Sequence, residues 1–267
     1  MITLSAIWLY PVKGLRGHPV DVATVEPRGL AGDRRCMVVD ENGAFVTQRQ
    51  DPTLVRMAAR WIGRSIALTH EGATVDVDLE HAGPSVDVRV WASDVRAVEL
   101  PLGSEFVSAA LGRRCRLVRL PESERRAVTS SAGLEGDQVS FADAFPYLLA
   151  STSSLDDRRA RAGDSSLSME RFRPNLVVDG LPPWAEDDVA ELTIGGVGFQ
   201  NRKPCDRCSV TLVDPESGKP GKEPLKTLST FRERDGKVYF GVNLVATSDG
   251  VVRVGDRFAV QRVKAPQ

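Results

Sequence analysis

The chain has 267 residues, of which 42% are hydrophobic and 27% are charged, and its formal net charge is −1. This length allows one large domain or two closely associated ones. A net charge near zero excludes a global field that would attract nucleic acid or an anionic membrane, so any bound anion needs a local cluster of cations.

The N-terminal sequence MITLSAIWLYPVKGLRG lacks the features of a targeting segment. It has no basic region, and Ser5 and Pro11 interrupt its apolar run. No part of the chain approaches the roughly 18 apolar residues of a membrane span, so we expect no signal peptide, anchor or membrane partner. The four cysteines do not resemble a disulfide framework, and Cys36 and Cys115 lie in apolar sequence. We therefore expect a reducing, cytoplasmic compartment.

The first hundred residues have the pattern of β-strands. Apolar runs are separated by turn signals at Asn42-Gly43 and at Glu71-Gly72. Several short strands at close spacing are typical of a barrel or sandwich. The segments with this pattern are residues 35–50, 65–80 and 86–100.

A short helix is predicted from Ser104 to Leu111, followed by Gly112 at the C′ position and by a strand at 114–120. Residues 121–140 are polar and rich in Gly and Ser, which indicates a mobile loop or a domain junction. We place a domain boundary there and expect one domain over 1–120 and a second over 121–267.

The second half is also rich in strand patterns. A helix is predicted over 153–163 with Ser154 as its N-cap, and another over 223–234 with Pro224 near its first position. The remaining segments, predicted to be strands or a tight hairpin, are 171–180, 192–200, 237–246 and 251–263. The expected fold class is mainly β with a few short helices (α+β).

Most of the usual catalytic motifs are absent from the sequence. The three histidines, His18, His70 and His81, have no motif around them, and G-x-S-x-G, H-E-x-x-H and P-loop patterns do not occur. Hydrolase triads and histidine-ligated metals are therefore disfavoured.

Cys205 and Cys208 form a C-x-x-C pair for which three interpretations compete. A zinc site would need a second pair or histidines nearby. A thioredoxin-like motif would open a helix, whereas SVTLVD, which follows the pair, has the pattern of a strand. On spacing alone, two cysteines packed near a turn remain the simplest interpretation.

The basic flanks of the pair change this balance. Lys203 and Arg207 would favour a thiolate, which suits a metal carried by an anionic cofactor better than a bare ion. Further groups suited to phosphate or to a heterocycle are Lys13 before Gly14, Arg34, Arg173 and Asn175. The residues by themselves predict a site for an anion and a thiolate, of unknown purpose.

Several segments, in the same order along nearly the whole chain, resemble a known family. They are YPVKGLRG, GLAGDRRCMVVDENGAFVTQRQDPTLVRM, FADAFPYLLASTSSL, RFRPNLVV and KPCDRCSVTLVDPESGKPGKEPLKTLSTFR. They are similar to the MOSC proteins, named for the C-terminal domain of molybdenum cofactor sulfurase, and more narrowly to the mitochondrial amidoxime-reducing component and its bacterial relatives. The resemblance implies a MOSC β-barrel over 121–267, an N-terminal MOSC-associated β-rich domain over 1–120, and a molybdenum–molybdopterin cofactor.

The resemblance also implies roles for individual residues. Cys208 matches the family's catalytic cysteine and molybdenum ligand. Gly14 and Asn243 depart from the Ser and Tyr of a relative. The residues that match cofactor-contacting positions are Lys13, Gly14, Arg34, Ser151, Thr152, Ser153, Arg173, Asn175, Asp206, Arg207 and Asn243.

The implied activity is that of an oxidoreductase in detoxification, which reduces N-hydroxylated compounds such as amidoximes, hydroxylamines and N-hydroxylated bases. No flavin, haem or iron–sulfur motif occurs, so electrons would come from a separate ferredoxin- or flavin-type reductase. Nucleic acid and membrane are not expected as partners. The alternative is a protein that binds or carries the cofactor without catalysis, or one that delivers sulfur as a Cys208 persulfide.

Overall fold

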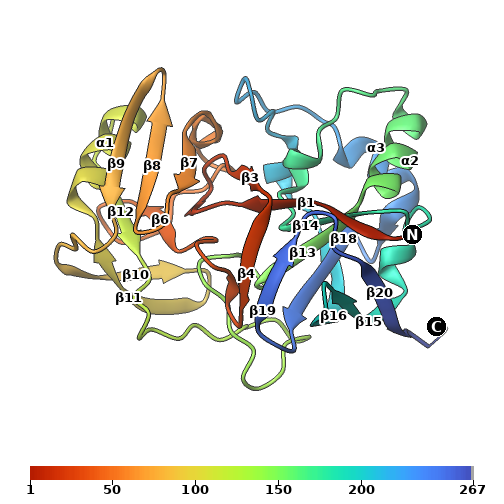
Figure 1. The fold of residues 1–267 in the computed structure, drawn as a ribbon. Coiled ribbons are helices and arrows are strands. Elements are labelled where there is room, and N and C mark those ends of the chain that lie inside the picture. Colours follow the sequence, from red (N-terminus) through yellow and green to blue (C-terminus); the bar gives the residue numbers. More distant parts are fainter. Residues whose placement is uncertain (266–267) are drawn as a thin grey trace.

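Strands dominate the computed structural model, which describes residues 1–265, and they form two sheet-rich halves side by side (Figure 1). Only three α-helices occur in this range, so the expected mainly β fold with a few short helices is confirmed. No helix among these residues is long and apolar enough to cross a membrane.

The C-terminal half is built on one large sheet. Its strand order is β20-β15-β16-β18-β13-β14-β1-β3, with β17 paired to β18, and only β13 and β14 run parallel. Alternating apolar side chains of these strands, such as Leu192, Leu244 and Leu176, form its core. The strands are β20 (Phe258–Val263), β15 (Val189–Ile194), β16 (Val197–Asp206), β18 (Lys237–Ala246), β13 (Tyr147–Ser151), β14 (Leu176–Asp179), β1 (Thr3–Leu9), β3 (His18–Val20) and β17 (Glu233–Arg234).

Strands within the first thirty residues pair with strands of the C-terminal half, although these residues precede it in sequence. β1 pairs with β14, and β4 (Val22–Glu26) pairs with β19 (Gly250–Arg253) and with β5 (Gly29–Leu30). Figure 1 shows β4 beside β19, between the two halves. The N-terminus is therefore built into sheets that the second half completes, and the boundary at residue 120 stays a prediction.

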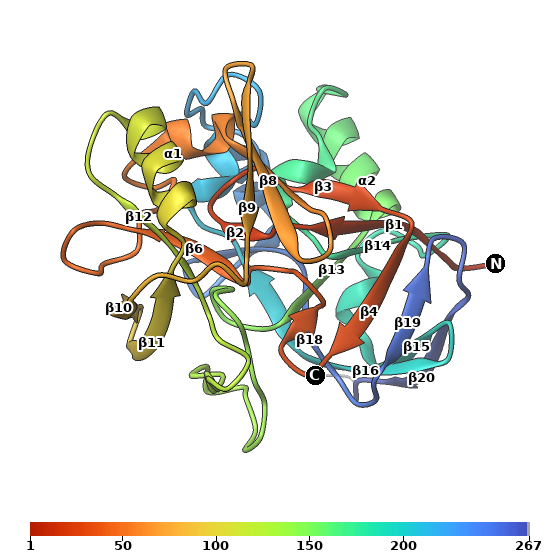
Figure 2. The same cartoon turned by 60° about the vertical axis from the view of Figure 1, so that its left-hand side comes forward.

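The other half contains two smaller sheets, β10-β11-β12-β6-β2 and β7-β8-β9. Helix α1 (Pro101–Leu111) packs against β12 and β9, and a second core lies beneath it. In Figure 2 this half comes forward, with α1 beside the β8–β9 hairpin. The strands are β10 (Ser85–Val90), β11 (Ser93–Glu99), β12 (Arg116–Arg119), β6 (Cys36–Val39), β2 (Val12–Lys13), β7 (Ala58–Trp61), β8 (Ser65–His70) and β9 (Ala73–Asp78).

The helix boundaries differ from the predicted ones. α1 begins at Pro101, because proline suits the first helical position and the Ser104 hydroxyl bonds inside the helix to the Leu100 carbonyl. α2 (Thr152–Ala162) has Ser151 at its N-cap, whereas Ser154 is buried inside it. α3 (Leu225–Arg232) is shorter than the predicted 223–234, and Pro224 is its N-cap.

Two predicted strands are not formed. In residues 35–50, only β6 is a strand, and Phe45 makes a single bridge to Val39. SVTLVD begins as the 3-10 turn η4 (Ser209–Leu212), since the backbone N–H and the hydroxyl of Thr211 both donate to the Cys208 carbonyl. The other 3-10 turns are η1 (Pro52–Arg56), η2 (Met169–Phe172) and η3 (Ala185–Asp187).

Candidate cofactor-binding cavity

A cavity of about 360 Å³ lies where segments from both halves meet. Its walls come from β2, the 46–49 segment, the β10–β11 turn, residues 142–145, the segment after η2 and the C-x-x-C. The structure thus brings residues distant in sequence to one place. The predicted site residues that line it are Lys13, Gly14, Arg34, Arg173, Asn175, Asp206, Arg207, Cys208 and Asn243.

Ser151, Thr152 and Ser153 do not line this cavity. Ser151 is fully buried and shares a hydrogen bond of 2.7 Å with the Ser153 hydroxyl, which donates to the Leu181 carbonyl at 2.6 Å. The Thr152 hydroxyl donates to Asp179 at 2.5 Å. These hydroxyl groups hold the start of α2 against the end of β14 and the segment after it, so we omit them from the proposed cofactor contacts.

The two cysteines have different cationic neighbours, although both are free thiols. The Cys208 sulfur accepts a hydrogen bond of 3.1 Å from Nη2 of Arg49, which the sequence analysis did not single out. Arg207 instead donates to the Cys205 sulfur at 2.9 Å. Lys203 donates to Asp206 at 2.8 Å. Burial alone would raise the pKa of Asp206, but the contact with Lys203 keeps this pKa below its ordinary value.

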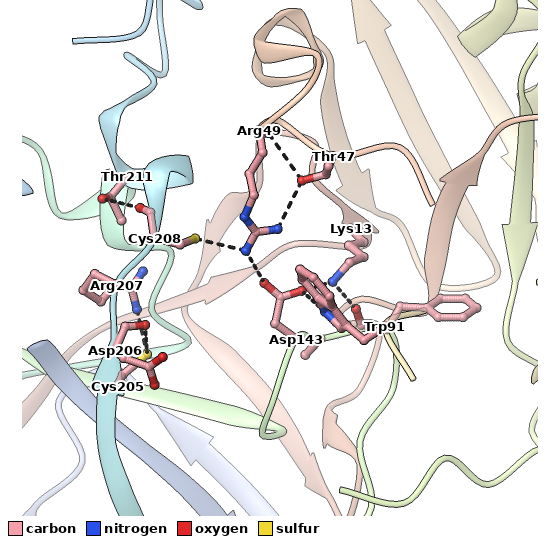
Figure 3. A network of polar contacts seen from close by, with 12 residues as sticks. Lys13, Thr47, Arg49, Trp91, Asp143, Cys205, Asp206, Arg207, Cys208 and Thr211 are labelled. Carbon is pink, nitrogen blue, oxygen red and sulfur yellow. Dashed lines mark hydrogen bonds and ion pairs between the residues drawn. The ribbon is translucent and has the colours of Figure 1, made fainter. Parts of the chain in front are cut away.

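Asp143 is the centre of a polar network next to Cys208 (Figure 3). Its carboxylate pairs with Lys13, accepts a hydrogen bond of 3.0 Å from the Trp91 indole N–H, and lies 3.7 Å from Arg49. Burial alone would raise the pKa of Asp143, but Lys13, with help from Trp91 and Arg49, holds it well below its usual range. Asp143 is therefore a carboxylate at neutral pH.

Lys13 is almost fully buried beneath this network. Its ammonium group also donates to the Phe141 carbonyl at 2.9 Å. Burial lowers the pKa of Lys13 below its ordinary value, against the opposing effect of Asp143. Gly14 follows with φ of +85°, a conformation that favours glycine, and its carbonyl accepts a hydrogen bond from Gln48.

Two arginines flank the ring of Tyr10 at the inner wall. The guanidinium carbons of Arg34 and Arg173 lie 4.4 Å and 4.2 Å from the ring centroid. Arg34 is paired with Asp33 at 2.5 Å, whereas Arg173 has no ion pair within residues 1–265 and donates only to the Leu15 carbonyl. Burial lowers the pKa of Arg173 to about 10, so it remains a cation at neutral pH.

Asn175 contacts one of these two arginines, Arg34. Its side-chain oxygen accepts from Arg34 at 3.0 Å and from the Leu148 N–H at 3.3 Å, and its amide donates to the Trp8 carbonyl. Its hydrogen bonds go to the protein and fix its orientation in the cavity wall, and its direct contact with the cofactor stays a prediction. Asn243 lines the cavity from β18.

The lining has a surplus of positive charge, although the whole chain is nearly neutral. Five side chains in the wall are cationic, and two, Asp143 and Asp206, are carboxylates. The cationic residues are Lys13, Arg34, Arg49, Arg173 and Arg207. Such a wall fits an anionic ligand. The buried Arg207 Nε, which lacks a partner within residues 1–265, is a further donor.

The donor set also fits a cofactor that brings its own metal. Cys208 supplies one soft sulfur donor in the cavity. Among residues 1–265, no group of three or more His, Cys, Asp or Glu side chains is arranged to hold a metal ion. The cavity thus combines a single thiol with cations suited to a phosphate group.

The fold and this cavity define a protein of the MOSC class. Residues 136–259 match the MOSC domain, and residues 1–114 match the MOSC N-terminal beta barrel domain. The chain is 32% identical to mitochondrial amidoxime-reducing component 1 from Homo sapiens, over 95% of this chain and 81% of the human protein. It is 32% identical to mitochondrial amidoxime reducing component 2 from Rattus norvegicus, over 95% of this chain and 82% of the rat protein.

A longer relative matches as well. The chain is 31% identical to the molybdenum cofactor sulfurase of Danio rerio, over 92% of this chain but only 32% of that protein. The chain belongs to the family of MOSC-domain proteins that includes the mitochondrial amidoxime-reducing components.

Proposed function

We propose that this protein is an oxidoreductase that uses a molybdenum cofactor to reduce N-hydroxylated compounds, such as amidoximes and hydroxylamines. The names of its relatives support the reaction class. The observation that carries the proposal is the cavity itself, in which the Cys208 thiol lies among five cationic side chains.

Each part of the cavity has a proposed role toward molybdenum–molybdopterin. Cys208 would hold the molybdenum through its sulfur, oriented by Arg49. Arg173, Arg34 and Arg207 would bind the phosphate and orient the pterin, because guanidinium groups match phosphate oxygens in pairs. When bound, the cofactor would supply the two-electron chemistry that removes the oxygen.

The reaction consumes two electrons and two protons for each substrate. The N–O bond breaks, the nitrogen leaves as an amine or amidine, and the oxygen leaves as water. Asp143 is held ionised and is therefore a poor proton donor. We propose that the protons come from solvent, which reaches the half-exposed Asp143 and Trp91 at the cavity wall.

The electrons are proposed to come from a separate ferredoxin- or flavin-type reductase. Reduced methyl viologen should support turnover of benzamidoxime, whereas NADH without a partner should not. Turnover with NADH alone would show that the chain needs no such donor. We also propose a cytoplasmic location, supported by four cysteines that all remain free.

A second function is supported by the sulfurase relative. The protein could carry the cofactor or deliver sulfur as a persulfide on Cys208. Sulfur delivery predicts cyanide-releasable sulfur on Cys208 and no turnover of benzamidoxime. The reductase function predicts turnover of benzamidoxime and no cyanide-releasable sulfur on Cys208.

The decisive experiment compares Cys208→Ser with Cys205→Ser after expression with ample molybdate. Molybdenum content is measured by elemental analysis and pterin by fluorescence. We expect molybdenum and benzamidoxime turnover to be lost in Cys208→Ser, with molybdenum retained in Cys205→Ser. Unchanged molybdenum and turnover in Cys208→Ser would overturn the proposed ligand.

A further inference from the structure

Trp91 occupies an unusual place for so large a side chain. It is the first residue of the two-residue loop between β10 and β11, where Val90 pairs with Ser93. Its φ is +54°, and glycine is the residue that commonly takes positive φ at the first position of such a loop. A bulky residue held in this conformation is strained, and strain of this kind gathers at functional sites.

Burial does not account for this tryptophan. The side chain is 44% exposed, yet it lines the cavity. Three neighbours fix its ring: the indole N–H donates to Asp143 at 3.0 Å, Phe45 meets it edge-on at 5.0 Å, and the Arg49 guanidinium carbon lies 4.8 Å from its centroid. The result is an oriented aromatic surface, part of which remains accessible.

Only one side chain, Arg49, separates this aromatic surface from Cys208, the proposed metal ligand. Arg49 contacts the Trp91 ring and also donates to the Cys208 sulfur. Figure 3 shows Arg49 between Cys208 on one side and Asp143 with Trp91 on the other. Cys208 and Trp91 line the same cavity, so a substrate whose N–O group lay at a metal on Cys208 would have the indole nearby, beyond Arg49.

We propose that Trp91 is a specificity-determining residue that stacks against the ring of aromatic and heteroaromatic N-hydroxylated substrates. This inference rests on the proposed function and adds the substrate class. Planar π-systems prefer offset or edge-on packing against an indole, and such contacts favour aromatic over aliphatic substrates. Benzamidoxime is the aromatic probe and acetamidoxime its aliphatic counterpart.

The test uses cofactor-loaded wild type, Trp91→Phe and Trp91→Gly, with reduced methyl viologen as the donor. Glycine suits the backbone at residue 91, so the variant without a ring is expected to fold. In Trp91→Gly, the ratio of kcat/KM for benzamidoxime over acetamidoxime should fall about tenfold, mainly through KM, and Trp91→Phe should keep it within about twofold. An equal ratio in wild type and Trp91→Gly would overturn the proposal.

A second measurement needs no turnover. Benzamidine, but not acetamidine, should quench the tryptophan fluorescence of the loaded wild-type protein, and Trp91→Phe should lose this quenching. Quenching that persists in Trp91→Phe, or that is absent from wild type, would contradict stacking on Trp91. If the wild type reduced neither amidoxime, the proposed function would fail, and the fluorescence titration would still decide whether Trp91 binds aromatic ligands.

Discussion

Arg49 and Cys208 are 159 residues apart in the chain, yet the guanidinium Nη2 of Arg49 donates a hydrogen bond of 3.1 Å to the Cys208 sulfur. Arg49 also contacts Trp91 and lies 3.7 Å from Asp143. One side chain from the N-terminal half thus orients the proposed metal ligand of the C-terminal half.

Replacing Arg49 by methionine should weaken metal retention. Groups that orient a metal ligand typically contribute about 10- to 100-fold to metal affinity or activity, so Arg49→Met should lose molybdenum about tenfold faster or more on dialysis. Arg49→Lys should be intermediate, because lysine keeps the charge but lacks the planar fork. Equal molybdenum retention in all three proteins would show that the contact to Cys208 is incidental.

Arg173 should be important for holding the cofactor's phosphate. It is a half-buried cation without an ion pair in residues 1–265, and a hydrogen bond to a charged group contributes about 1.5–3 kcal/mol. Arg173→Gln should therefore weaken cofactor retention roughly tenfold to a hundredfold, measured as pterin fluorescence after gel filtration. Arg96→Gln, on the exposed face of β11, is the matched control and should retain wild-type pterin content. A similar loss in both variants would argue against a phosphate site at Arg173.

Gly14 should tolerate no side chain without loss of cofactor. Gly14 and Gly72 have φ of +85° and +84°, so alanine at either position should cost about 1–3 kcal/mol of unfolding free energy. Only Gly14 lies beside Lys13 in the cavity wall, whereas a Cβ at Gly72 meets open space. Thermal melts should show similar destabilisation for the two variants, and pterin content should fall only in Gly14→Ala. Equal pterin content would show that the turn at Gly14 does not shape the site.

Glu186 should make stability depend on pH. Its side chain is fully buried, burial raises its pKa from 4.5 to about 7, and its contact with Ser154 only partly opposes this. Between these two values the folded protein holds a proton that the unfolded chain releases, so stability falls as pH rises through this window. Glu186→Gln should remove this dependence and be more stable than wild type at pH 8, by up to roughly 3 kcal/mol. Parallel stability–pH curves for the two proteins, from denaturant titrations, would rule out this effect.

Much of the fold and part of the site could be predicted from the sequence. Alternating apolar residues predicted most strands, since side chains of a strand point to opposite faces. The order of the family-like segments predicted that Lys13, Arg34, Arg173 and Cys208 would converge, although no spacing argument could show it. All four line one cavity.

The contact of Cys208 with Arg49 could not be predicted from the neighbours of Cys208 in sequence. Arg207, which follows the end of β16, donates to Cys205 and not to Cys208. Arg49 and Asp143 lie inside segments that resemble the family, whereas Trp91 lies in none of them. Membership in these segments was the only signal that could have drawn attention to Arg49 and Asp143. Their roles depend on tertiary contacts between distant segments, which local patterns do not record.

The pairing of the first strands has a consequence for how the protein is made. Thr3 of β1 pairs with Asp179, and Val22 of β4 pairs with Arg253. During translation, β1 and β4 are therefore synthesised long before these partner strands. At 5–20 residues per second, this delay is roughly 10–50 s for β4. Because Lys13 lies between these strands, the cavity can be completed only after β19 has been synthesised, and we expect cofactor loading to follow that point.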